Sequence, residues 1–426
     1  MSKLALLGGP KTITEPFVRY NSIGKEEAEV ARRVIEGGVL SKFLGCWGPD
    51  FYGGEQIQAF EREWESYFSV KHAVTVNSNT SGLMAAIGAI GIEPGDEVIV
   101  SPWTMSATAT SILVWNAIPV FADIEPETYN LDPASIERNI TPYTKAIVVT
   151  DIFGHAADLE AIMEIARKHQ LKVIEDCAQA PGAFYKNKYV GTIADIGVFS
   201  LNYHKHIHTG EGGVCVTNDS NLAERIQLIR NHAEAVVGDK GVGDLANMIG
   251  FNFRMTEIEA AIGREQLKKL SMLVGQRIHA ANLLTEGLLA LKGITPPMVK
   301  KDCTHVYYVY PIGYRKEDTG VARHRIVEAL IAEGVSVGST YANLHLLPIY
   351  QKKQAYGKNG FPWSAAFYKG SVSYKKGICP VAESLNDGKY MGIGMCEYSY
   401  TDQQINLIIK AFQKVWANLD LLKESR

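Results

Sequence analysis

Seven short apolar runs, each bounded by turn-forming residues, constrain the fold of this chain more than any other feature of its sequence. They occupy residues 73–76, 97–100, 118–122, 146–150, 172–176, 196–200 and 213–217. Because successive positions are apolar, both faces of each strand would be buried, as in a parallel sheet covered on both sides. Helical patterns fill the intervals between the first five runs, at 81–90, 106–115, 133–139 and 158–169. This alternation predicts an α/β fold with a mostly parallel seven-stranded sheet sandwiched by helices.

The spacing of the runs changes after residue 176. Pro181 and Gly182 interrupt the next segment, and only twelve residues separate Ser200 from Gly213. Such a gap is too short for a helical crossover, so we expect loops between the last strands and a mixed sheet.

A long helical pattern at 255–291 introduces a different arrangement of elements. It is followed by a strand pattern at 305–312 and by helical patterns at 321–334 and 402–419. This mixture is typical of a smaller α+β unit. We therefore expect an N-terminal arm and large domain in 1–265 and a small C-terminal α+β domain in 266–426.

Charge and cysteine spacing exclude several classes of protein. Among the 426 residues, Lys and Arg total 43 and Asp and Glu 46, a net charge of −3, so the chain lacks the basic excess that binds nucleic acid or anionic membranes. Six cysteines lie far apart without a CxxC pair, which favours reduced thiols in a cytoplasmic protein over a disulfide framework. The uncharged stretch 98–122 is interrupted by Pro102 and Pro119, so we expect no membrane-spanning helix.

Ligands of open α/β sheets bind beyond the carboxyl ends of the strands, which makes the residues after each run the candidates for a site. Residues 77–82, Asn-Ser-Asn-Thr-Ser-Gly, follow the first run and lead into a helix. The backbone N–H groups and the dipole of that helix favour an anion such as a phosphate. Ordinary helix capping by these residue types is the alternative interpretation.

The fifth run ends in two acidic residues, Glu175 and Asp176. A carboxylate at the end of a buried strand is costly unless it meets a cation or hydrogen-bond donors. The protonated ring nitrogen of a bound cofactor would meet that need, and a capping or salt-bridged aspartate is the alternative.

The sixth run ends at Ser200, where a phosphate could bind, and Lys205 follows in a segment that turns back at glycines. A lysine whose pKa is lowered by its surroundings can form a Schiff base with a carbonyl compound. A solvated loop lysine is the alternative. His204, His206 and His208 alternate along this segment, but no Asp, Glu or Cys stands at ligand spacing, so we expect no metal site.

Together these features match one cofactor. A phosphate cradle, a strand-end acid, a serine and a lysine follow one another along the predicted sheet. Pyridoxal phosphate requires a phosphate anchor, an acidic partner for its pyridine nitrogen and a lysine that bonds to its aldehyde. The sequence therefore predicts pyridoxal phosphate as the cofactor.

The chain also resembles the DegT/DnrJ/EryC1/StrS family of pyridoxal-phosphate-dependent sugar aminotransferases, which have the fold type I, aspartate aminotransferase-like architecture. The similarity extends over nearly the whole chain. It rests on ordered motifs that include LALLGGPK, GGEQIQAFEREW, VIEDCAQAPGA, VFSLNYHKHIHTGEGG, GFNFRMTEIEAAIG and CPVAESL. The resemblance implies the fold type I large domain for the predicted sheet.

The resemblance also implies roles for particular residues. Lys205 matches the Schiff-base lysine, Asp176 the partner of the pyridine nitrogen, and Gln179 the residue near the cofactor's phenolic oxygen. The residues that match the phosphate contacts are Asn79, Thr80 and Ser200. Asn252 matches an asparagine that reaches the phosphate from the neighbouring subunit, which implies a homodimer with shared active sites.

Two further sets of residues follow from the resemblance. The family stacks an aromatic side chain on the cofactor ring, whereas here the aligned position is Met105, with Trp103 two residues earlier. His345 lies in a segment, YANLHLLPIY, that resembles one near the family's substrate pocket, and a structural loop histidine is the alternative. Additional candidates for substrate contacts are Glu175, Tyr203 and His204.

The expected activity is transfer of an amino group from an amino acid, expected to be glutamate, to a keto-sugar of amino-sugar or lipopolysaccharide biosynthesis. The acceptor is expected to be nucleotide-linked or a free sugar acid, such as an eight-carbon lipopolysaccharide-core sugar. A keto-inositol acceptor is one alternative, and a pyridoxal-phosphate-dependent sugar dehydratase is another. Some relatives with dehydratase activity have His in place of the lysine, so Lys205 favours transamination. A non-catalytic binding protein on the same fold is the third alternative.

Overall fold

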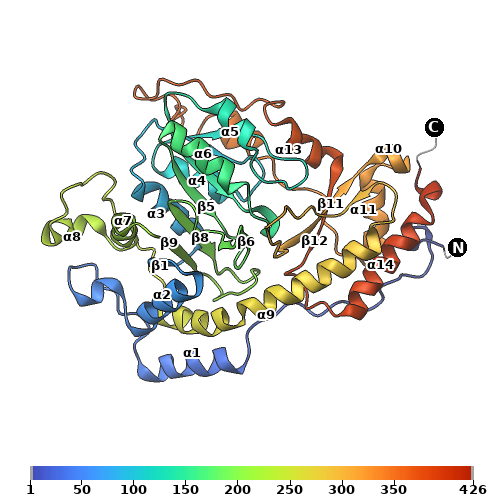
Figure 1. Ribbon diagram of the computed structural model, residues 1–426, viewed down its shortest axis with the longest axis horizontal. Coiled ribbons are helices and arrows are strands. Elements are labelled where there is room, and N and C mark those ends of the chain that lie inside the picture. The colour runs from blue at the N-terminus through green and yellow to red at the C-terminus, as the bar shows by residue number, and fades with distance from the viewer. Residues whose placement is uncertain (1–2, 424–426) are drawn as a thin grey trace.

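The computed structural model describes residues 3–423, and its centre is a seven-stranded sheet (Figure 1). All seven apolar runs form strands, namely β1 (His72–Val76), β2 (Glu97–Val100), β3 (Ile118–Phe121), β4 (Thr144–Thr150), β5 (Lys172–Asp176), β8 (Ile196–Ser200) and β9 (Gly213–Thr217). Their spatial order is β1-β9-β8-β5-β4-β2-β3. The predicted sheet is therefore confirmed.

The sheet is mixed, as the spacing of the runs predicts. β3, β2, β4, β5 and β8 run parallel, whereas β9 pairs antiparallel with both β8 and β1. Because only a loop joins β8 to β9, the chain returns beside β8 in the opposite direction. Every residue of β2, β3, β8 and β9 is buried, which explains why these runs carry no polar face.

Helices cover both faces of the sheet. The parallel strands are connected by α3 (Asn79–Ala89), α4 (Ser106–Val114), α5 (Pro133–Asn139) and α6 (Leu159–His169). Successive residues of a strand point to opposite faces. Gly82 of α3 lies against Val198 of β8, whereas Trp64 of α2 (Glu55–Phe68) packs on the next residue, Phe199. Helices α2 and α3 therefore cover opposite faces (Figure 1).

Further elements surround this sheet. Helix α1 (Lys25–Gly37) packs along α9 (Glu257–Leu288), a single helix of 32 residues. The others are α7 (Ser220–Arg230), α8 (Ala233–Lys240) and a hairpin of β6 (Phe184–Tyr185) and β7 (Lys188–Tyr189).

A smaller antiparallel sheet lies toward the far end of α9 (Figure 1). Its strands are β10 (Ile294–Thr295), β11 (Val309–Tyr314) and β12 (Tyr390–Gly394), and its helices include α10 (Lys316–Thr319), α11 (Arg323–Ala332) and α14 (Asp402–Trp416). Two short helices, α12 (Pro348–Gln351) and α13 (Pro380–Ser384), belong to the connection between α11 and β12.

The strand expected at 305–312 begins later, at Val309. The N–H groups of Val306 and Tyr308 donate to the carbonyl oxygens of Gly154 and Phe153, 2.8 Å away in both cases. The alternating pattern at 305–308 therefore reflects an extended segment bound to the loop after β4, and the expected start of the strand is wrong by four residues.

Two hydrophobic cores share α9. Leu270 packs in the core around the large sheet, and Ala281 packs in the core around the small sheet. Two segments cross the predicted boundary at 265/266. Leu4 and Ile13 of the N-terminal arm pack in the small core, whereas the part of the chain from 344 to 390 returns to the large core.

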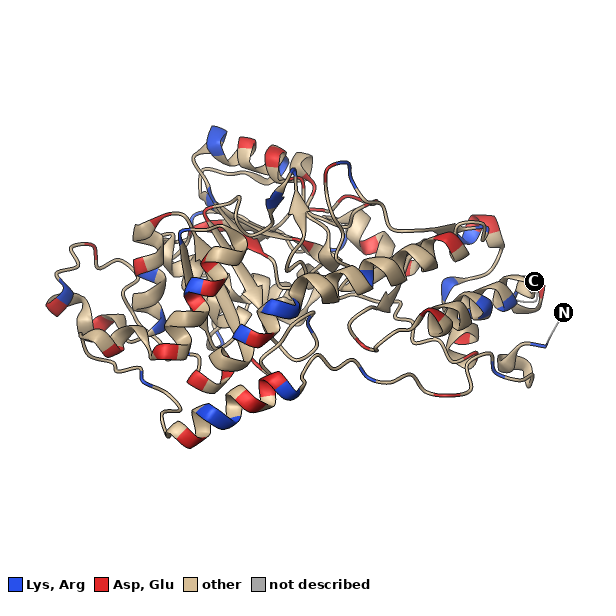
Figure 2. Ribbon diagram, turned by 60° about the horizontal axis from the view of Figure 1, so that its bottom comes forward, with Lys and Arg blue, Asp and Glu red and all other residues tan. Residues whose placement is uncertain are grey.

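Charge is spread evenly over the molecule. Figure 2 shows acidic and basic residues interspersed along the surface helices rather than gathered by sign. On α1, for example, Arg32 forms ion pairs with Glu29 and Glu36. Among residues 3–423, the helices are too short or too polar to cross a membrane.

Candidate active site

A pocket of about 150 Å³ opens where the carboxyl ends of β4, β5 and β8 meet the starts of α3 and α4. Sequence-predicted residues from separate parts of the chain meet there. Those that line the pocket are Asn79, Thr80, Met105, Asp176, Gln179, Ser200, His204 and Lys205. The predicted location at the carboxyl edge of the sheet agrees with this arrangement.

Lys205 is carried by a loop that closes on itself. The N–H of Lys205 donates to the carbonyl of Asn202, and the N–H of Leu201 donates to the carbonyl of Gly212. The lysine side chain is only 8% exposed. This burial lowers the pKa of Lys205 to about 8, against the opposing attraction of the Asp176 carboxylate. A larger share of the amine is therefore neutral near physiological pH than in an exposed lysine, which suits a nucleophile or a base.

Asp176 ends β5 with its carboxylate toward α3 and α4. Its Oδ2 accepts a 2.7 Å hydrogen bond from Thr108 Oγ1, and its Oδ1 accepts from the N–H of Ala178 and from Asn79 Nδ2. Burial raises the pKa of Asp176, and the donors and the Lys205 amine only partly oppose that shift. A cationic group beside this carboxylate would therefore be stabilised.

A chain of threonine hydroxyls leads to Asp176. Thr150 Oγ1 donates to Thr104 Oγ1, and the Thr104 and Thr108 hydroxyl oxygens are 3.2 Å apart. Because the single proton of Thr108 is used toward Asp176, Thr104 must be the donor to Thr108. All three protons therefore point toward the carboxylate, so each bond polarises the next. No sequence motif marked these three threonines.

The start of α3 offers N–H groups to an anion. Ser78 caps the helix by accepting from the N–H of Ser81, which leaves the first two helical N–H groups, those of Asn79 and Thr80, without partners inside the helix. Both residues line the pocket. Capping and anion binding are therefore compatible here, although the Asn79 side chain itself turns to Asp176 and to the carbonyl of Val198.

Gly213 is required for this close approach. A Cβ at that position would lie 2.8 Å from the backbone nitrogen of Asn79. Ser200, which pairs with Gly213 across β8 and β9, lines the pocket next to the same helix start.

Gln179 and the two candidates for stacking on the cofactor ring, Met105 and Trp103, lie in different places relative to the pocket. Gln179 accepts from the N–H of Phe153 and donates to the hydroxyl of Tyr341. Met105 lies at the mouth of the pocket and is 61% exposed. Trp103 is fully buried among other aromatic rings and does not line the pocket, so of the two only Met105 could contact a ring bound there.

Three other candidates lie away from the pocket in this chain. His345 is fully buried and bonds to Glu383. Asn252 is exposed and accepts from Arg254 Nε. Glu175 points to the opposite face of β5 from Asp176, where its carboxylate accepts from backbone N–H groups at positions 191, 193 and 194. Neither Glu175 nor His345 is placed for direct contact with a ligand in the pocket.

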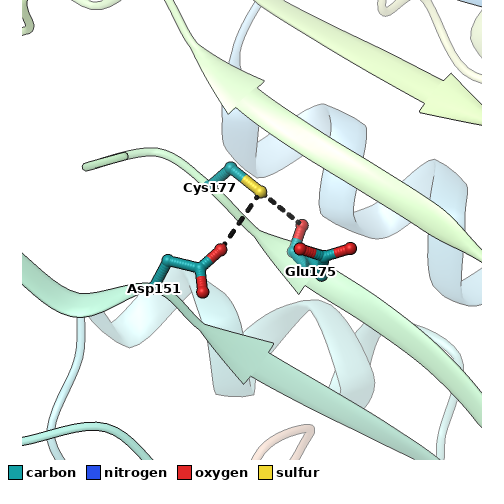
Figure 3. Close-up of side chains that lie close together, drawn as sticks. All are labelled: Asp151, Glu175 and Cys177. Carbon is teal, nitrogen blue, oxygen red and sulfur yellow. Dashed lines mark hydrogen bonds between the residues drawn. The ribbon is translucent and has the colours of Figure 1, made fainter. Parts of the chain in front are cut away.

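Glu175 belongs to a buried cluster with Asp151 and Cys177, shown in Figure 3. Their potential metal-ligating atoms lie within 4.8 Å of one another. Cys177 Sγ donates to an oxygen of Asp151, whose other oxygen accepts from the N–H of Ala157. Burial, reinforced by the neighbouring Glu175 carboxylate, raises the pKa of Asp151 well above its usual value. Protons and backbone donors therefore account for this cluster without a metal ion.

A second cavity, of about 560 Å³, shares His204 with the pocket. Tyr203, which is 67% exposed, also lines it. No sequence motif marked its remaining lining residues, which come from the N-terminal arm and from the small sheet and the segments next to it; they include Arg19, Tyr308, Cys396 and Glu397. Because they are far from the motifs along the chain, only a three-dimensional structure brings them to this site.

The pocket fits pyridoxal phosphate. It combines a buried amine, a buried carboxylate that needs a cationic partner, and unpaired N–H groups at a helix start with Ser200 beside them. These are the three points that the aldehyde, the ring nitrogen and the phosphate of this cofactor require.

Comparisons with known proteins agree with this donor set. The model of the DegT/DnrJ/EryC1/StrS aminotransferase family matches residues 46–381. GDP-perosamine synthase of Caulobacter vibrioides is 38% identical over 75% of this chain and 86% of its own length. L-glutamine:2-deoxy-scyllo-inosose aminotransferase of Micromonospora echinospora is 35% identical over 88% of this chain and 90% of its own.

The fold agrees as well. The crystal structure of an aminotransferase from Psychrobacter cryohalolentis superposes with a TM-score of 0.80 and 29% identity, covering 95% of this chain and 100% of that one. The protein therefore belongs to the DegT/DnrJ/EryC1/StrS aminotransferase family, and it is an aminotransferase with pyridoxal phosphate as its cofactor.

Proposed function

We propose that this enzyme transfers an amino group from glutamate or glutamine to a keto-sugar during amino-sugar or polysaccharide biosynthesis. The observation that carries the proposal is that the Lys205 amine and the Asp176 carboxylate line the same pocket, with the hydroxyl chain behind the carboxylate. The two curated relatives described above are named for a GDP-linked amino sugar and for a keto-inositol.

The roles of the chain's own residues follow from their placement. When bound, pyridoxal phosphate supplies an aldehyde that bonds to amines and a ring that withdraws electrons. Lys205 would hold the cofactor and, with its amine free, would be the base that moves a proton at the substrate's α-carbon. Asp176 holds the proton on the ring nitrogen. The N–H groups of Asn79 and Thr80, with Ser200, hold the phosphate.

The larger cavity is proposed to bind the part of the keto-sugar that lies outside the pocket of Lys205. Tyr203, His204 and Tyr308 offer polar groups to sugar hydroxyls, and Arg19 offers a cation to a carboxylate or phosphate. This lining suits a nucleotide-linked keto-sugar and also a free sugar acid, such as an eight-carbon lipopolysaccharide-core sugar. A keto-inositol is the alternative acceptor, favoured by the extensive similarity to the Micromonospora enzyme.

A homodimer is part of the proposal. Met105 and Tyr203 are large, exposed side chains at the openings of the two cavities. Asn252, the residue expected to reach a neighbour's phosphate, is exposed on the same chain. A second copy of the chain would cover such surfaces and complete the phosphate site.

The test uses the two half-reactions separately. Purified protein is mixed with glutamate or with glutamine, and the loss of absorbance of the lysine-bound cofactor is followed. The aminated enzyme then receives a nucleotide-linked keto-hexose, a keto-octulosonic acid or a keto-inositol, and the product is analysed by mass spectrometry. We expect an amino-sugar product from one acceptor class and none from Lys205→Ala. Loss of a hydroxyl group without incorporation of nitrogen would instead establish a dehydratase.

A further inference from the structure

The ring of Tyr308 lies against the amine of Lys205. The Nζ atom is 4.2 Å from the centroid of that ring. Within residues 3–423, the Lys205 amine donates no hydrogen bond to an oxygen or nitrogen atom of the protein. The aromatic face is thus its most direct contact, and ring faces attract cations at this distance.

The position of Tyr308 does not depend on the lysine. Its N–H donates to the carbonyl of Phe153, 2.8 Å away, and its own carbonyl accepts from the N–H of Met395 at 3.0 Å. These bonds tie Tyr308 to the loop after β4 on one side and to the segment after β12 on the other. The backbone that carries the ring is therefore held by contacts independent of Lys205.

Tyr308 acts through its ring rather than through an ionised hydroxyl. Burial raises the pKa of Tyr308 far above its usual value, helped by the nearby phenol of Tyr341. The phenol stays neutral, so its π face is the feature that distinguishes an ammonium from a neutral amine.

We propose that Tyr308 is a positioning residue that holds the Lys205 ammonium beside the pocket whenever this amine is not bonded to the cofactor. The inference rests on the proposed function, in which Lys205 is released and recaptured in every catalytic cycle. A held amine stays close to the atoms between which it moves a proton, whereas a free lysine side chain would sample many rotamers.

Other charged and titratable groups act on the same amine from every side. Asp176 on β5 favours the ammonium, as does any ionised fraction of the Cys396 thiol after β12. The remaining groups around the loop are His204, His206, Glu211 and, on α9, Arg277. A variant of Tyr308 leaves all of these in place. Loss of the ring's attraction lowers the pKa of Lys205, whereas any gain of water at the amine would raise it, so the direction of the change separates the two effects.

The experiment measures the amine directly, without turnover. Full-length protein is loaded with pyridoxamine phosphate, which has no aldehyde, so Lys205 is free. The rate of its modification by an amine-specific reagent is then followed across a pH series by peptide mass spectrometry. Tyr308→Leu removes the ring, Tyr308→Phe keeps it, and Tyr143→Leu removes an exposed tyrosine outside both cavities.

We expect Tyr308→Leu to move the apparent pKa of Lys205 down by about half a unit to one unit, because the ring no longer stabilises the cation. Tyr308→Phe and Tyr143→Leu should match the wild type. An unchanged titration in Tyr308→Leu, or an equal shift in Tyr308→Phe, would overturn the inference. Tyr308→Met serves as the second ringless variant if the leucine variant does not fold.

A separate experiment shows whether the proposed function itself, rather than the role of Tyr308, is wrong. Borohydride reduction of the wild-type protein with pyridoxal phosphate should attach the cofactor to Lys205. Attachment at another lysine, or none, would refute the role of Lys205 itself, whatever the Tyr308 variants show.

Discussion

The Thr108→Val substitution tests how far the hydroxyl chain supports catalysis. Valine has nearly the shape of threonine but cannot donate a hydrogen bond, so Oδ2 of Asp176 loses its 2.7 Å donor while packing at the buried site is preserved. A hydrogen bond to a charged acceptor contributes about 1.5–3 kcal/mol. The ionised form of Asp176, which holds the proton on the cofactor's ring nitrogen, is destabilised by that amount.

Loss of the hydrogen bond from Thr108 to Asp176 should lower kcat more than it weakens substrate binding. If the whole contribution is felt in the transition state, the rate falls by about 10- to 100-fold, since about 1.4 kcal/mol is a factor of ten. Thr104→Val removes the donor to Thr108 and the acceptor of the Thr150 hydroxyl, and it should cost a few-fold, because the bond from Thr108 to Asp176 remains. The control is Thr110→Val on the same helix, whose hydroxyl only donates to the carbonyl of Ser106.

The assay is single-turnover amination of the cofactor by glutamate in stopped flow, with cofactor content and Tm measured for each variant. A Thr108→Val rate within twofold of the wild type at full cofactor occupancy would refute the reasoning. So would an equal loss in Thr110→Val, since it would point to a general effect on α4.

Two further predictions concern stability. Gly82→Ala places a Cβ 2.7 Å from Val198, so it should push α3 from the sheet and lower the free energy of unfolding by about 1–3 kcal/mol. Gly275→Ala on α9, where nothing lies within 4 Å of the new Cβ, should raise the free energy of unfolding by about 0.5–1 kcal/mol. Equal Tm values in the two variants would contradict this prediction. Glu333 is fully buried, and burial alone raises the pKa of its carboxyl group. Hydrogen bonds from the Ala5 N–H, Lys414 and Thr12 outweigh that effect and hold the pKa below its usual value. A carboxyl group with a lowered folded-state pKa contributes stability above its unfolded pKa and loses it as the pH falls, so Glu333→Gln should lower Tm near neutrality, with a gap to the wild type that closes in acid. A gap independent of pH in calorimetry would argue against an ionised Glu333.

The large sheet could be predicted because its strands are buried on both faces. Runs such as 97–100 and 213–217 are apolar between their end residues and buried throughout, and short turns separate them from the helical patterns. Even the antiparallel β9 follows from the short gap after Ser200. Local spacing carries this information, so one sequence suffices.

The small unit was less predictable because its elements depend on distant partners. The extended segment at 305–308 has the alternation of a strand, yet its donors are used by the loop at 153–154. Likewise, no local sequence pattern shows that residues 344–390 pack in the large core or that Leu4 packs in the small core. Arg19 and Tyr308 reach the larger cavity through these long-range contacts.

The two acids at the end of β5 show why residue type alone does not assign a role. Glu175 and Asp176 are adjacent, both carboxylates and both buried, but neighbouring residues of a strand face opposite sides of the sheet. On one side, three backbone N–H groups meet Glu175 and fix the turn that precedes β8. On the other, Asp176 also accepts from three donors, Thr108, Asn79 and the N–H of Ala178, but its carboxylate faces the pocket and the Lys205 amine. Both acids therefore have donors, and the parity of the strand decides which of them lines the pocket, where a cationic ring can stabilise it.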